Sequence, residues 1–133
     1  EKQYFSTIDA FISGAIDPGL FIIEGKLMPG ISIEHARDSI KEELNILKIE
    51  RIPNHELEKL KNTVESSLTF SEISIMNKAI SLAFFEALGD AALINDEARR
   101  YQEISAEDIM QTAQNLFTDE NCNELIYLRK ENV

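Results

Sequence analysis

The feature that most constrains the fold is a change of hydrophobic period at Pro29-Gly30. Before this point apolar residues recur every second position, as on a half-buried strand, and after it they recur at steps of three and four, as on a helix. The alternation predicts two antiparallel strands, over residues 3–13 and 20–28. In the turn between them, Pro18 fixes φ and Gly19 is free to adopt a positive φ. One face of the first strand is predicted to carry Tyr4, Ser6, Ile8, Ala10 and Ile12.

Helical periodicity then continues for most of the chain. Apolar residues recur at helical spacing within residues 33–47, 54–68, 73–88, 90–99 and 105–117. Ser32, Asn54 and Ser105 are predicted N-caps, the last in a capping box with Asp108. The third helix has so broad an apolar face that we expect deep burial, and Gly89 is predicted to end it.

A final strand is predicted over Glu124–Lys130. Two strands, about five helices and one strand give an α+β fold, an antiparallel sheet with helices packed on one face. Three strands make a thin sheet for so many amphipathic helices. We therefore expect further strands from an upstream segment or from a second copy of the chain.

Composition limits the classes of function. The 133 residues are 44% hydrophobic, with 13 Lys and Arg against 24 Asp and Glu, a formal charge of −11. Such a surface repels phosphate backbones, so nucleic acid is not expected as a partner. The longest apolar runs are too short to cross a bilayer, and no signal peptide is visible. The chain starts without Met, and we interpret it as part of something longer.

The two histidines allow every histidine-based metal site to be considered. Residues 31–35 have the spacing of the inverted zincin motif His-x-x-Glu-His, but Ile31 stands where the first ligand should be and only His35 is in place. Residues 55–59 have the spacing His-Glu-x-x-His, with Lys59 at the second ligand position. Each motif needs two imidazoles on one helical face. Antiparallel packing of the two helices would also keep the histidines apart, so no metal site is predicted.

Other side chains that might carry chemistry have simpler explanations. Cys122 is the single cysteine, beside a predicted strand, where a packed thiol is the ordinary role. The Glu42-Glu43 pair fits a solvated helix face, and Arg99-Arg100 beside Tyr101 fits the charge complement of a helix C-terminus. No nucleophile elbow, P-loop or dinucleotide fingerprint occurs. The predicted catalytic, cofactor-binding and metal-binding residues are therefore none.

Several stretches, in order, resemble insulinase-like (pitrilysin-like) zinc metallopeptidases, the inverzincin family that includes mitochondrial processing peptidase. Asp-Pro-Gly-Leu-Phe at 17–21 and Pro-Gly-Ile-Ser at 29–32 resemble that family's hairpin and helix entry. Residues 56–62 are similar to its Glu-Leu-x-x-x-Lys-Asn helix. Residues 105–109, Ser-Ala-Glu-Asp-Ile, followed by Ala113, are similar to a helix near the end of its domain. The resemblance covers nearly the whole chain.

The resemblance implies two homologous α+β halves that close around an unfolded peptide. Zinc is held in the N-terminal half, and a metal-bound water attacks the peptide bond with the motif Glu as base. None of these ligands has a counterpart here, which implies that residues 1–133 are a single, partial C-terminal domain. The family's substrate-holding Arg would precede Glu1, and its Tyr position falls on Thr7, with Tyr4 out of register.

We therefore expect a non-catalytic segment of a zinc endopeptidase that forms fold and substrate-chamber wall and is inactive alone. The chain itself needs no cofactor, whereas zinc is expected in the intact parent. Expected partners are the N-terminal part or a homologous subunit, a peptide substrate, and a second copy through open sheet edges. A soluble protein of the cytoplasm or the bacterial periplasm is expected.

Two other classes stay open from the sequence. One is an inactive peptidase-like scaffold or peptide-binding subunit without its own zinc, and a His-x-x-Glu-His motif upstream would argue against it. The other is a free-standing helical interaction module, which would be a self-sufficient monomer. A sheet without its neighbours should instead pair through its open edges.

Overall fold

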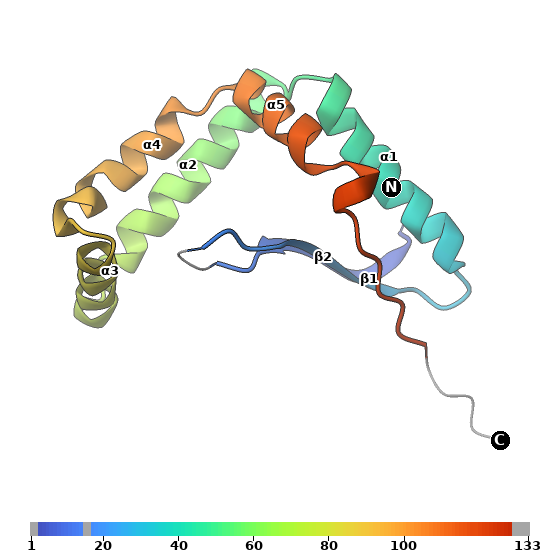
Figure 1. The fold of residues 1–133 in the computed structure, drawn as a ribbon, viewed down its shortest axis with the longest axis horizontal. Coiled ribbons are helices and arrows are strands. Elements are labelled where there is room, and N and C mark those ends of the chain that lie inside the picture. The colour runs from blue at the N-terminus through green and yellow to red at the C-terminus, as the bar shows by residue number, and fades with distance from the viewer. Residues whose placement is uncertain (1–2, 15–16, 129–133) are drawn as a thin grey trace.

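A computed structural model describes residues 3–14 and 17–128. It is α+β, as predicted: a two-stranded antiparallel hairpin lies beneath an arch of helices (Figure 1). In chain order the elements are β1 (Phe5–Ile12), β2 (Phe21–Leu27), α1 (Ile33–Ile49), α2 (Asn54–Ser71), α3 (Ile75–Ala87), the 3₁₀ helix η1 (Ala91–Asp96), α4 (Glu97–Glu103), α5 (Ala106–Leu116) and η2 (Asp119–Asn121).

The hairpin departs from simple alternation at a β-bulge between Phe5 and Thr7. The extra residue changes the parity of the strand, so Phe5, rather than Tyr4 or Ser6, shares a face with Ile8. Gly25 pairs with Ile8 on the facing strand, and a Cβ added to it would point to this same face and come 2.8 Å from the Phe5 ring. The predicted face was therefore wrong at its first two members, because period-two counting cannot register a bulge.

The turn of the hairpin needs a glycine at position 19 because there is no room there for a side chain. Gly19 does not adopt the positive φ that is open to it, since among the described residues only Gly30 and Gly89 have a positive φ. A side chain on Gly19 would instead collide with the Ser13 carbonyl oxygen. Ser13 and Leu20 close the turn with a backbone bond of 2.9 Å and a bond of 2.8 Å from the Leu20 N–H to the Ser13 hydroxyl.

Among the pairs of α-helices, α1 and α5 make the most extensive contact. Each contributes one buried small residue, Ala36 and Ala113, and small side chains let helix backbones approach closely. At the end of α1, Lys48 donates to the Phe117 carbonyl at 3.1 Å, and its own carbonyl accepts from Gln114 at 2.7 Å. These bonds also satisfy carbonyls that a helix end leaves without an internal partner.

The other limb of the arch is held by contacts between α2 and α4. Leu57 is the buried residue of α2, and Lys61 donates to the Gln102 carbonyl at 2.8 Å. The Gln102 amide in turn donates to Glu65 at 2.8 Å. Polar bonds thus fix α4 along α2 where few apolar side chains are buried.

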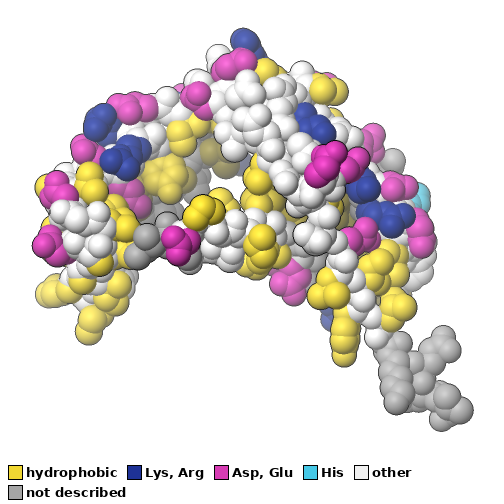
Figure 2. Space-filling model, in the orientation of Figure 1, with side chains coloured by type: hydrophobic (Ala, Val, Ile, Leu, Met, Phe, Trp, Pro, Cys, Tyr) yellow, Lys and Arg dark blue, Asp and Glu magenta, His cyan; other side chains and the backbone are white. Residues whose placement is uncertain are grey.

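Helix α3 contradicts the expected deep burial. It has no buried residue, and its outward side chains include Ile75, 87% exposed, and Met76, 68% exposed. Hydrophobic atoms gather visibly on this helix at the lower left of Figure 2. The sequence pattern reported an apolar helix correctly, but burial also requires a partner, and only η1 packs extensively on α3. Its end is as predicted, with Gly89 at φ 112° and Schellman-type bonds from Gly89 to Glu86 and from Asp90 to Phe85.

Three smaller expectations need correction. Pro53, not Asn54, is the N-cap residue of α2, so no side chain caps that helix. The helix predicted over 90–99 is divided into η1 and α4 and continues to Glu103. Residues 124–128 form no strand, because the hairpin is the whole sheet of the described chain and offers them no ladder; residues 129 and 130 lie outside the described residues.

The core is correspondingly small. Within the described ranges only Ala36, Leu57 and Ala113 are buried. The chain has the secondary structure of a two-layer domain while much of the apolar surface of its hairpin, α3 and C-terminal segment faces outward. No helix of the described residues is long and apolar enough to cross a membrane.

Candidate functional site

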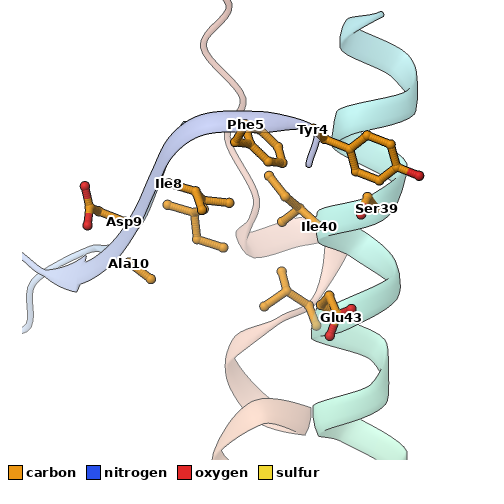
Figure 3. Close-up of a pocket in the computed structure, with 10 residues that line it drawn as sticks. Tyr4, Phe5, Ile8, Asp9, Ala10, Ser39, Ile40 and Glu43 are labelled. Carbon is orange, nitrogen blue, oxygen red and sulfur yellow. The ribbon is translucent and has the colours of Figure 1, made fainter. Parts of the chain in front are cut away.

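A wide, open hollow of about 380 Å³ lies between the hairpin and α1 (Figure 3). The bulged strand supplies Phe5 and Ile8 to one wall, and α1 supplies Ile40 and Leu44 to the other. The remaining lining residues are Tyr4, Asp9, Ala10, Ile23, Ser39 and Glu43. A mainly apolar floor beside an open strand suits the side chains of an extended peptide.

The lining lacks the groups that hydrolysis would need. Its ionisable side chains are the carboxylates of Asp9 and Glu43 and the phenol of Tyr4, with no histidine or cysteine. The Ser39 hydroxyl has no imidazole beside it among the lining residues, so no activated nucleophile is formed there. The hollow can therefore hold a chain but has no evident means to cut one.

His35 lies at the start of α1, where its ring packs against Tyr4 with 5.0 Å between ring centroids. Its backbone N–H donates to the Ser32 hydroxyl at 3.2 Å, the N-cap bond that we predicted. This contact ties the beginning of β1 to the beginning of α1. The role visible for His35 is thus a packing contact between the hairpin and the helix.

His55 lies in the first turn of α2 at the top of the arch, and it is exposed. Helices α1 and α2 diverge instead of packing antiparallel, yet the outcome for the histidines is as expected, because the length of α1 separates them (Figure 1). Throughout residues 3–14 and 17–128, no group of three or more His, Cys, Asp and Glu side chains could hold a metal ion.

The remaining candidates also lie apart from the hollow. Arg99 forms ion pairs with Glu103 at 2.7 Å and Asp96 at 3.1 Å, and hydrogen bonding to Glu103 foremost raises its pKa. Arg100 occupies the last turn of α4, as expected for a helix-end cation. Cys122 is exposed, which contradicts the packed thiol that we predicted, because the strand expected beside it does not form.

The motif residues that carry the family resemblance turn out to join elements together. Leu57 is buried, and Lys61 links α2 to α4. Ser105 and Asp108 form the predicted capping box: the Asp108 N–H donates to the Ser105 hydroxyl, and the Ser105 N–H donates to the Asp108 carboxylate at 2.8 Å. The Ser105 hydroxyl, and after it the Ser105 N–H, lower the pKa of Asp108. Ala113 is buried beside α1.

The positions compared with the family's substrate-holding pair differ in their surroundings. Thr7 follows the bulge and is paired with Lys26 on the exposed hairpin. Tyr4 is half-buried and lies in the wall of the hollow. The out-of-register tyrosine, Tyr4, is therefore the one of the two positions that lies beside the hollow.

No family model and no curated protein matches the chain. Solved structures do. A "putative zinc protease" from Bordetella pertussis Tohama I superposes with a TM-score of 0.81 at 21% identity, covering 96% of this chain and 71% of that one. The inactive peptidase domain of a "putative zinc protease" from Bordetella parapertussis gives 0.82 at 21%, covering 95% and 69%.

A protease from Helicobacter pylori gives a TM-score of 0.80 at 20% identity, and 89% of this chain covers only 29% of that protein. At these identities the likeness shows the fold. The chain shares the fold of zinc protease-like peptidase domains, one of them described as inactive, and it spans only part of each.

Proposed function

We propose that this chain is a non-catalytic segment of a peptidase-like protein, forming part of the fold and wall of a chamber that holds unfolded peptide. The observation that carries the proposal is the superposition on peptidase domains over at least 89% of the chain. Zinc and the hydrolytic base would come from an N-terminal half or a homologous subunit of the insulinase-like kind. The apolar hollow beside β1 would contact peptide side chains.

A second candidate is an inactive peptidase-like scaffold that binds peptide and has no zinc-bearing half. One of the structures with this fold is itself described as an inactive peptidase domain, and this favours the alternative specifically. The coding sequence upstream of residue 1 discriminates between the two. A His-x-x-Glu-His motif there supports the peptidase, and its replacement by non-ligating residues supports the scaffold.

The direct test uses a fluorescently labelled unfolded polypeptide. The chain alone, supplied with zinc, should leave the polypeptide intact in mass spectra but bind it in an anisotropy titration. Ile40→Lys in the floor of the hollow should weaken binding by about tenfold, the effect of a buried unpaired charge. Ile49→Lys, at a 73% exposed position at the end of α1, is the matched control and should bind as the unmodified chain does.

Two results would contradict the proposal. Cleavage of the polypeptide by the chain alone, abolished by a chelator, would show that the chain carries its own metal chemistry. Equal binding by the Ile40→Lys and Ile49→Lys variants would remove the hollow from the peptide-contact surface.

A further inference from the structure

The two limbs of the arch correspond to different parts of the chain. The first limb contains β1, β2, α1, α5 and η2, and the second limb contains α2, α3, η1 and α4. The second limb, residues 54–103, is therefore a continuous insertion between α1 and α5. Two short linkers, residues 50–53 and 104–105, join it to the first limb at the top of the arch (Figure 1).

Packing within each limb is more extensive than packing between the limbs. Every extensive contact in the described chain joins two elements of one limb: β1 with β2 and α1 with α5 in the first, and η1 with α3, η1 with α4 and α2 with α4 in the second. No hydrogen bond among the described residues joins one limb to the other, whereas Lys48 bonds to Phe117 within the first and Lys61 to Gln102 within the second. Parts of a chain that share no large apolar interface are expected to move relative to each other.

The backbone of both linkers is extended. The ψ angles are 136° at Glu50 and 139° at Pro53 in the first linker, and 130° at Ile104 and 163° at Ser105 in the second. In the described part of the chain, no backbone hydrogen bond connects a residue before either linker with a residue after it. A hinge requires such residues, whose φ and ψ can change without breaking a bond of a helix.

One ion pair connects the linkers at the top of the arch. Arg51 lies in the first linker, and its guanidinium pairs with the carboxylate of Glu107, in the first turn of α5 just after the second linker. Both side chains are more than half exposed, and an exposed ion pair contributes little to stability. The pair therefore restrains the linkers without locking them.

We propose that the second limb rotates as a unit relative to the first about the two linkers, and that the Arg51–Glu107 ion pair restrains this rotation. Helix α3 lies at the far end of the second limb, so the rotation displaces α3 most and changes its separation from the hairpin (Figure 1). The hollow is lined by residues of the first limb alone, and the rotation leaves its lining intact. The inference concerns the chain by itself and does not rest on the proposed function.

The first test compares distance distributions between spin labels, measured by pulsed electron resonance on the full chain in the Cys122→Ser background. Glu34→Cys with Ser66→Cys spans the two limbs, and Glu34→Cys with Thr112→Cys lies within the first limb; all three positions are exposed. The distribution across the limbs should be at least about twice as wide as the one within the first limb, because hinge motions exceed those of packed helices in amplitude.

The second test removes the restraint. Arg51→Ala should widen the distribution across the limbs further, because the linkers lose their ion pair. Lys78→Ala is the matched control: it removes an exposed ion pair, with Glu72 at 3.6 Å, that lies within the second limb. This variant should leave the distribution across the limbs unchanged.

Equal widths for the two labelled pairs would overturn the hinge. Equal effects of Arg51→Ala and Lys78→Ala would overturn the role of the ion pair in it. Neither outcome bears on peptide binding at the hollow, so failure here is distinguishable from failure of the proposed function.

Discussion

Helices α1 and α5, on one limb of the arch, pack against each other, whereas α3, at the end of the other limb, is the most apolar of the three and the most exposed. The α1–α5 pair buries Ala36 and Ala113 and is joined by the bonds of Lys48 with Phe117 and Gln114. Helix α3 has a higher mean hydropathy than α1 or α5, yet none of its residues is buried. The apolar pattern of a helix determines which face is favourable to bury, but burial also requires another element that packs against that face.

Truncating Leu57 in α2 should give the largest difference in unfolding free energy from a matched change in α3. Leu57→Ala truncates the one buried residue of α2 and should lower the free energy of unfolding by about 2–4 kcal/mol. Ile75→Ala on α3, where the side chain is 87% exposed, should change it by less than about 0.5 kcal/mol at low protein concentration. Urea titrations measure both. Equal losses would show that α3 is as buried as α2.

A larger side chain introduced in place of alanine should destabilise the α1–α5 contact more than it destabilises α3. Ala113→Leu forces a larger side chain into the α1–α5 contact and should cost about 1–3 kcal/mol in the same titration. Ala83→Leu makes the identical change on the open face of α3 and should cost less than about 0.5 kcal/mol. A neutral Ala113→Leu would mean that the two helices do not approach closely.

The N-caps provide a smaller, matched comparison. Ser105 and Ser74 each accept a bond from a backbone N–H three residues on, at 3.2 Å and 3.3 Å. Ser105→Ala should lower the global unfolding free energy by about 1 kcal/mol, because α5 is part of the packed pair. Ser74→Ala should instead speed hydrogen exchange in the first turn of α3 and barely change global unfolding. Equal losses of global unfolding free energy for the two variants would contradict the view that α5 is part of the packed core and α3 is not.

The smallest effect is the pH dependence at Asp108. Because the Ser105 hydroxyl holds the folded-state pKa of Asp108 below its ordinary value, the stabilisation is present above that ordinary value, about 3.9, and is lost as pH falls through the lower one. The difference in melting temperature between the unmodified chain and Asp108→Asn should therefore shrink from pH 6 to pH 2. A difference that stays constant over this range would refute the assignment.

The sequence predicted most features that depend on neighbours along the chain, although the N-cap expected at Asn54 was wrong, and it failed where contacts with distant elements decide. The N-caps at Ser32 and Ser105 and the stop at Gly89 are local and were correct. Burial of α3 and a strand over 124–130 require other elements, and in the described chain these elements do not cover them. The hollow could not be predicted because it depends on a one-residue bulge after Phe5.

The central claim is that a peptidase-like fold is present without a metal site. Elemental zinc analysis of the purified, tag-free chain after extensive dialysis tests it most directly. We expect close to zero zinc per chain, because His35 packs on Tyr4 and His55 lies exposed at the start of α2. About one zinc per chain, lost on replacing either histidine with alanine, would contradict it.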